Sequence, residues 1–308
     1  MRNRTTFIIA TLTCGIPCSV LPAQELSLNP ATGNYSLRYF SDELNREVAI
    51  EIIPPNKIAP TAELALVRRG VDGAHVYSYT IRNKRSVGSL QGIGLMEMVC
   101  PPRAFTSVVR TEGWDGSARG PSARTLGRDH CVFLVTDDAG ILPGEAREGI
   151  ELATQWLPAI SSGNFWGLAE PFQFPPEEQA EHAPELHNLI RMVDGVGGGW
   201  VRSDLVSPGR DPAQYTNPMT LLRAISGDLS QACTLAWITN GGVCRSLQVK
   251  LSHAETSLQG QKVSTTRNEL ESFLAELDAQ HGPQPGKHVN ENAYWLLRTN
   301  VEYLLSRL

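Results

Sequence analysis

The stretch His75-Val76-Tyr77-Ser78-Tyr79-Thr80-Ile81 decides the fold of the first half of the chain. Apolar and polar residues alternate along it, which is the period-two pattern of a strand with one face on a core. The following Arg82-Asn83-Lys84 ends the run with a turn-favouring asparagine between two charged residues. The stretch therefore predicts one strand of an antiparallel sheet.

Similar short runs lie on both sides of this strand and are separated by turn residues. They cover residues 35–40, 48–53, 63–67, 93–99, 131–135 and 150–154. No helical period separates them, and short strands at regular spacing are typical of antiparallel sandwiches. We therefore expect a β-sandwich domain over residues 24–160.

The order of elements in this region resembles a known class of domain. The strand at 77–83 is followed by one with Ile93 and Leu95, then by Pro101-Pro102, by Glu112-Gly113-Trp114 and by residues 139–145 with Pro143-Gly144. This order resembles immunoglobulin-like sandwich domains of secreted bacterial proteins of unassigned role. Trp114 is the one candidate for ligand stacking, and the alternative is that it covers one end of the sandwich core.

The period changes to that of helices after Asn217. Four apolar stripes at helical spacing lie at 219–229, 247–258, 270–277 and 293–305. Asn240-Gly241-Gly242 is expected to form a turn with left-handed residues between the first two helices. The stripes predict an antiparallel four-helix module at 217–308, so the fold class is α+β with several domains.

This helical region resembles the FIMAH-type module found at the C-termini of secreted and cell-surface bacterial proteins. The resemblance is carried by residues 238–251, 267–277, 286–289 and 293–297, with Gly282-Pro283-Gln284-Pro285 as an insertion in one loop. It implies an extracellular context and an interaction or spacer role, with no reaction attached.

The segment between these regions, 161–216, is expected to be an irregular connector with one short helix at 184–193. Its Gly195-Val196-Gly197-Gly198-Gly199 run lacks the Lys-Ser/Thr of a phosphate loop, so it is interpreted as part of the connector.

The N-terminus predicts export. Arg2 and Arg4 precede an apolar stretch that reaches Ile16, and Leu21-Pro22-Ala23 gives a small-residue end. This is the order of a signal peptide over residues 1–23. We expect no membrane span in the mature chain and a secreted location, whether periplasmic, extracellular or at the cell surface.

Cysteine usage agrees with export. Cys100, Cys131, Cys233 and Cys244 remain after the signal peptide, and an even number in an oxidising compartment indicates two disulfides. Three connectivities are possible, and spacing favours Cys100–Cys131 and Cys233–Cys244. A zinc site is the alternative, although no Cys-x-x-Cys pair is present.

Composition and motifs point to binding more than to catalysis. The net charge is −5 and no basic block could follow a phosphate backbone, so nucleic acid is not an expected partner. None of the common hydrolase, metalloprotease or nucleotide-binding motifs occurs, and no cofactor or metal is expected. The seven histidines are scattered, with His182 and His187 beside several glutamates in what is interpreted as a solvated acidic stretch.

Three functional hypotheses follow from this sequence. The leading one is a non-catalytic interaction protein that recognises a glycan or other polymer, or an envelope protein. An extracellular hydrolase with an unrecognised site on the sandwich is the second, and a structural spacer of the envelope is the third. A clustered acid pair or triad in a concave pocket of the β-domain would favour the hydrolase, and a flat, aromatic-lined strand face would favour polymer binding. A featureless polar surface would favour the spacer.

Overall fold

The computed structural model describes residues 25–41, 45–69, 74–100, 108–109, 113–119, 129–136, 139–168 and 200–308. The expected signal peptide, the expected helix at 184–193, and His182 and His187 lie outside these residues. The chain divides into two compact units, and each is described by itself.

The first unit contains a three-stranded antiparallel sheet of order β1-β2-β3. The strands are β1 (Glu25–Leu28), β2 (Tyr35–Ser41) and β3 (Arg46–Ile52). The sequence predicted the second and third strands but assigned them to the sandwich. They form a sheet of their own because the hairpin pairs β2 with β3 along their whole length, while β1 pairs with the other edge of β2.

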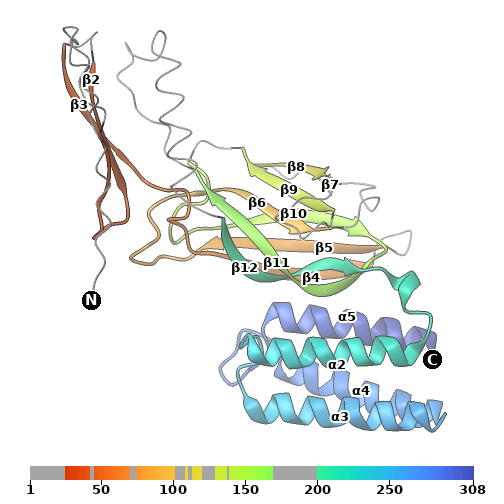
Figure 1. Ribbon diagram of the computed structural model, residues 1–308. Helices are drawn as coiled ribbons and strands as arrows, with labels where there is room; N and C mark the ends of the chain where they lie inside the picture. The colour runs from red at the N-terminus through yellow and green to blue at the C-terminus, as the bar shows by residue number, and fades with distance from the viewer. Residues whose placement is uncertain are drawn as a thin grey trace, which may run out of the picture. The chain divides into compact units, whose positions relative to one another are not determined.

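The second unit contains a sandwich of two antiparallel sheets, drawn in Figure 1. One sheet has the order β4-β5-β10-β7 and the other the order β12-β11-β6-β9-β8. The strands are β4 (Pro60–Arg69), β5 (His75–Asn83), β6 (Ile93–Val99), β7 (Val108–Val109), β8 (Trp114–Arg119), β9 (His130–Val135), β10 (Ala146–Thr154), β11 (Leu157–Gly167) and β12 (Val201–Arg210).

The strand order is that of an immunoglobulin-like sandwich. The first two strands, β4 and β5, pair side by side and β10 joins them, whereas the third strand, β6, crosses to the other sheet and pairs with β11 and β9. Immunoglobulin-like domains divide their strands between two sheets in this way. The expected fold class is therefore confirmed.

Alternation in the predicted strand β5 accounts for the sandwich core. Tyr77, Tyr79 and Ile81 are each at most 1% exposed, because every second side chain of a strand points to the same face. Phe133 of β9 and Phe165 of β11, on the opposite sheet, are buried in the same core. These large side chains account for much of the apolar area that the sandwich buries.

The turn before β10 agrees with the sequence. Gly144 has a φ of +95°, which a residue without a side chain adopts at little cost, and Pro143 precedes it. The backbone N–H of Glu145 donates to the carbonyl of Leu142 at 2.9 Å and closes the turn.

Four helices follow the sandwich in the described C-terminal residues 200–308, as the sequence predicted. They are α2 (Pro218–Thr234), α3 (Gly241–Gln259), α4 (Val263–Gln280) and α5 (Glu291–Arg307), and a 3-10 turn η2 (Pro212–Gln214) precedes them. In Figure 1, α2 and α5 lie nearest the sandwich, and α3 and α4 lie on their far side. Leu270, Phe273, Leu296 and Leu297 are fully buried among them.

The turn between α2 and α3 differs from the expectation. Gly241 and Gly242 begin α3 rather than forming a left-handed turn, because the side-chain oxygen of Asn240 accepts hydrogen bonds from the N–H groups of Gly242 and Val243 and caps the helix. The left-handed residue in this turn is Ala236, with a φ of 55°.

The range that was expected to be an irregular connector contains regular structure at both ends. The strand β11 continues through Gly167, and the strand β12 begins at Val201. The two strands pair from Leu157↔Arg210 to Phe165↔Val201. Each of these strands finds its hydrogen-bonding partner far along the sequence, so the local sequence does not reveal it. The chain then leads from β12 into the helices.

The helix α5 joins the helical region to the sandwich. The side chain of Asn292 accepts from the N–H of Leu64 at 2.7 Å and donates to the carbonyl of Ala62 at 3.1 Å. Trp295 donates to the carbonyl of Ala65 at 3.0 Å. All three backbone groups belong to β4, an edge strand, so α5 covers an edge that could otherwise pair with another strand.

Candidate functional site

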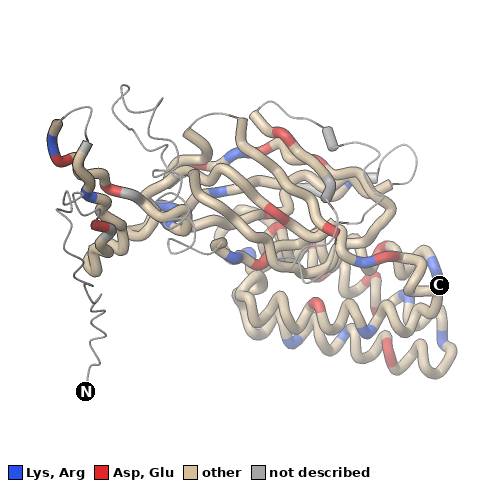
Figure 2. Tube along the Cα trace, turned by 45° about the horizontal axis from the view of Figure 1, so that its top comes forward, with Lys and Arg blue, Asp and Glu red and all other residues tan. Residues whose placement is uncertain are grey.

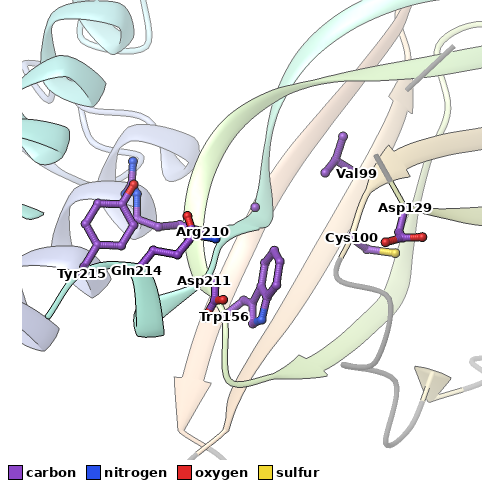
Figure 3. Close-up of a pocket in the computed structure, with 9 residues that line it drawn as sticks. Val99, Cys100, Asp129, Trp156, Arg210, Asp211, Gln214 and Tyr215 are labelled. Atoms are coloured by element: carbon purple, nitrogen blue, oxygen red, sulfur yellow. The ribbon is translucent and has the colours of Figure 1, made fainter. Parts of the chain in front are cut away.

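A pocket of about 410 Å³ opens where the sandwich passes into the helical region, and we name it the Trp156 pocket. Figure 3 shows Trp156 between Tyr215, Gln214 and Asp211 on one side and Cys100 and Asp129 on the other. The pocket is lined by Val99, Cys100, Asp129, Trp156, Gly209, Arg210, Asp211, Gln214 and Tyr215.

Two half-buried aromatic rings are the main apolar surfaces of the pocket. The backbone of Trp156 is fixed on both sides, since its N–H donates to Thr154 Oγ1 at 3.1 Å and its carbonyl accepts from the Tyr77 hydroxyl at 2.6 Å. Tyr215 ends η2 and packs partly on the core. The faces of such rings can stack on a ligand.

Polar side chains surround these rings. Asp211 caps η2, because its Oδ1 accepts from the N–H of Ala213 at 2.9 Å and Pro212 occupies the first position of the turn. Asp129 is half-buried and Gln214 is exposed. Carboxylates and an amide beside aromatic rings can hydrogen-bond the edge of a ligand while its apolar face stacks.

The cation that lines the pocket is already paired. Arg210, 8% exposed, donates to both carboxylate oxygens of Asp228 at 2.8 and 3.0 Å and to the carbonyl of Pro158 at 3.0 Å. Burial raises the pKa of Asp228 to about 6, although the guanidinium acts against this by charge and hydrogen bonding. The guanidinium carbon of Arg210 also lies 5.5 Å from the centre of the Tyr215 ring.

A disulfide holds one wall of the pocket. Cys100 at the end of β6 is bonded to Cys131 of β9, and the N–H of Cys100 donates to the carbonyl of Asp129 at 3.2 Å. The bridge therefore fixes the backbone that carries Asp129. The second bridge, Cys233–Cys244, joins α2 to α3, so both pairings that spacing favoured are present in the structure.

Trp114, the candidate for ligand stacking, lies elsewhere. It begins β8, is 5% exposed and donates its indole N–H to the carbonyl of Glu148 at 3.3 Å. The ring belongs to the sandwich core, which is the alternative position that the sequence left open.

The described histidines do not converge on the pocket. His75 and His130 are buried in strands, His253 lies on α3, and His281 and His288 lie near the junction of α4 and α5. Within the described ranges, no group of three or more His, Cys, Asp or Glu side chains is placed to hold a metal ion.

Sequence reasoning missed the residues of this pocket. Asp129, Trp156 and Tyr215 are separated by tens of residues, so no local motif connects them. Asp211-Pro212 is the one local signal, since it is the capping pair of a short helix.

Comparison with known proteins identifies one region of the chain. Residues 224–306 match the family model of the FIMAH domain. The helical region carries a FIMAH domain. The match spans α3, α4, nearly all of α5 and α2 from residue 224 onward, and no curated protein matches the chain.

A solved structure is similar to part of this chain. It is an uncharacterised protein from Nocardia farcinica with an immunoglobulin-like fold, 10% identical, and the match covers 35% of this chain and 75% of that one with a TM-score of 0.24. The assignment of an immunoglobulin-like fold rests on the order of the strands in the two sheets.

The two disulfides and the FIMAH domain are consistent with an extracellular protein. Among the helices in the described ranges, none is long and apolar enough to cross a membrane.

Proposed function

We propose that this chain is an exported recognition protein that binds a glycan of the cell envelope or the extracellular surroundings, with the Trp156 pocket as its binding site. The observation that supports this most directly is the meeting of two aromatic rings with Asp129, Asp211 and Gln214 in one pocket. Sugars present apolar faces bounded by hydroxyl groups, so they match a site with ring faces and hydrogen-bonding edges.

An extracellular hydrolase is the second candidate, since two aspartates line the same pocket. Glycoside hydrolysis uses a pair of carboxyl groups on either side of the scissile bond. Asp211 already uses one oxygen to cap η2, and Figure 3 draws Trp156 between the two aspartates. This arrangement favours recognition, and an assay of released sugar separates the two functions.

The test is sedimentation of the chain from residue 24 onward with insoluble polysaccharides and with peptidoglycan, with soluble sugar measured in the same tubes. We expect binding without release, and a loss of about tenfold or more in affinity for Trp156→Ala. The variant should fold, because the two hydrogen bonds that fix residue 156 are made by its backbone.

The matched control is Phe40→Ala, which removes an aromatic side chain that is 38% exposed on β2. It should bind as the unmodified chain does. Release of sugar would replace recognition with hydrolysis, and absence of binding to every polymer would favour the spacer role.

A further inference from the structure

Asp129 and Asp211 of the Trp156 pocket have no cationic partner among the described residues. The pocket's single cationic residue among the lining set, Arg210, is neutralised by Asp228, with both terminal nitrogens engaged. Asp129 makes no side-chain hydrogen bond or ion pair with another described residue, and the second oxygen of Asp211 is likewise available. Two carboxylates therefore face a ligand without a counter-charge from any residue that the structure describes.

This charge is a local property of the pocket. Figure 2 shows acidic and basic residues interspersed along the described trace of the sandwich and the helices. Charges more than about 10 Å away are largely screened at physiological salt, so the lining residues set the potential that a ligand meets.

The aromatic rings favour the same sign of ligand as the carboxylates. The face of a tryptophan or tyrosine attracts cations through its quadrupole. Tyr215 already has the Arg210 guanidinium within 5.5 Å of its ring centre, whereas Trp156 has no cation–π partner among the described residues. A cation that enters the pocket would meet Trp156 together with Asp129 and Asp211, while an acidic sugar would be repelled.

We infer that the pocket selects a sugar that carries a free, protonated amine, as in a deacetylated amino-sugar polymer. This inference rests on the proposed glycan recognition and specifies its ligand class. Acetylation removes the charge of the amine and adds bulk, so it should weaken binding, whereas the hydroxyl contacts of the sugar remain.

The test compares two matched ligands by titration calorimetry with the chain from residue 24 onward, at pH 6.5, where Asp228 is mostly ionised and pairs with Arg210. One is a hexasaccharide of β-1,4-linked glucosamine, and the other is the same hexasaccharide with every amine acetylated. We expect the free-amine form to bind about tenfold more tightly, because two carboxylates and a ring face act on its charge.

Two conservative variants assign this preference to the pocket. Asp129→Asn and Asp211→Asn each remove one charge, and asparagine at 211 can still cap η2. Each should lower the preference for the free amine, measured as the ratio of the two affinities, roughly threefold. Glu271→Gln, a change at an exposed site on α4, should alter neither affinity.

Equal affinity for the two hexasaccharides, or a preference that survives both Asp variants, would overturn the inference and leave glycan recognition in place. Failure of both hexasaccharides to bind would also overturn the inference. The sedimentation experiment with polysaccharides tests the proposed glycan recognition separately. A lysine hexapeptide carries the same ammonium group on a peptide, and tighter binding of it than of glucosamine would assign the pocket to a protein partner instead.

Discussion

Asn83 of the sandwich and the buried polar side chains of the FIMAH-containing helical region differ in where they make hydrogen bonds. In the sandwich, Asn83 bonds only to the sandwich and its loops: it donates to the carbonyls of Gln91 and Ile141 and accepts from Ala59 and Ser89. The helical region buries Asp228, Thr266, Asn292, Thr299 and Asn300. Three of these five, Asp228, Asn292 and Asn300, bond to groups of the sandwich.

This difference indicates how the two regions are joined. Apolar side chains form one continuous core through both, but apolar contacts are weakly directional. The hydrogen bonds of Asp228, Asn292 and Asn300 fix one orientation, because a buried donor or acceptor is costly when its partner is displaced. The helical region is therefore docked on the sandwich by specific contacts and is not a freely moving appendage.

The largest expected effect comes from breaking the buried ion pair. Arg210→Ala leaves the Asp228 carboxylate in a buried site without its partner and should lower the free energy of unfolding by about 3 to 5 kcal/mol at pH 7. Urea unfolding followed by tryptophan fluorescence measures this loss. The control is Arg223→Ala, whose pair with Glu255 is on the surface and should contribute about 1 kcal/mol or less.

The pH dependence of stability tests the same contact between Arg210 and Asp228. Because burial raises the pKa of Asp228 to about 6, the folded state binds this proton more tightly than the unfolded chain does. The stability that Asp228 contributes is then complete below about pH 4 and is lost as the pH rises through about 6. Relative to Asp228→Asn, the unmodified chain should lose up to about 3 kcal/mol between pH 3.5 and pH 7.

Unfolding midpoints in urea at several pH values give this difference directly. The contributions of all other carboxyl groups cancel in the difference between the unmodified chain and Asp228→Asn, because both proteins contain these groups. A difference that grows in favour of the unmodified chain as the pH rises would mean that pairing with Arg210, rather than burial, governs the carboxyl.

A smaller effect is expected at the edge strand. Asn292→Ala leaves the N–H of Leu64 and the carbonyl of Ala62 without their partner in a buried place and should cost about 2 kcal/mol. Hydrogen exchange should quicken at the Leu64 amide more than at amides inside α5. Asn268→Ala, at an exposed position of α4, is the control and should change stability by less than about 0.5 kcal/mol. Unchanged protection of Leu64 would contradict the role of Asn292 as a specific contact.

Much of the secondary structure could be predicted from the sequence because its signals are local. The alternation of β5 and the apolar stripe of α5 each lie within one element, so the period of the residues indicates the element and its buried face. Strands such as β12 were missed, since this strand has few alternating apolar residues and gains its place from pairing with β11.

The sequence by itself determined the strands around Tyr77, the four helices, and the cysteines available for two bridges. These features depend on neighbouring residues along the chain. The tertiary structure alone decided that Asp129, Trp156 and Tyr215 share a pocket and that Asn292 reaches the edge of β4. Both depend on contacts between residues far apart in sequence, and such contacts form only when the sheets and helices pack around one core.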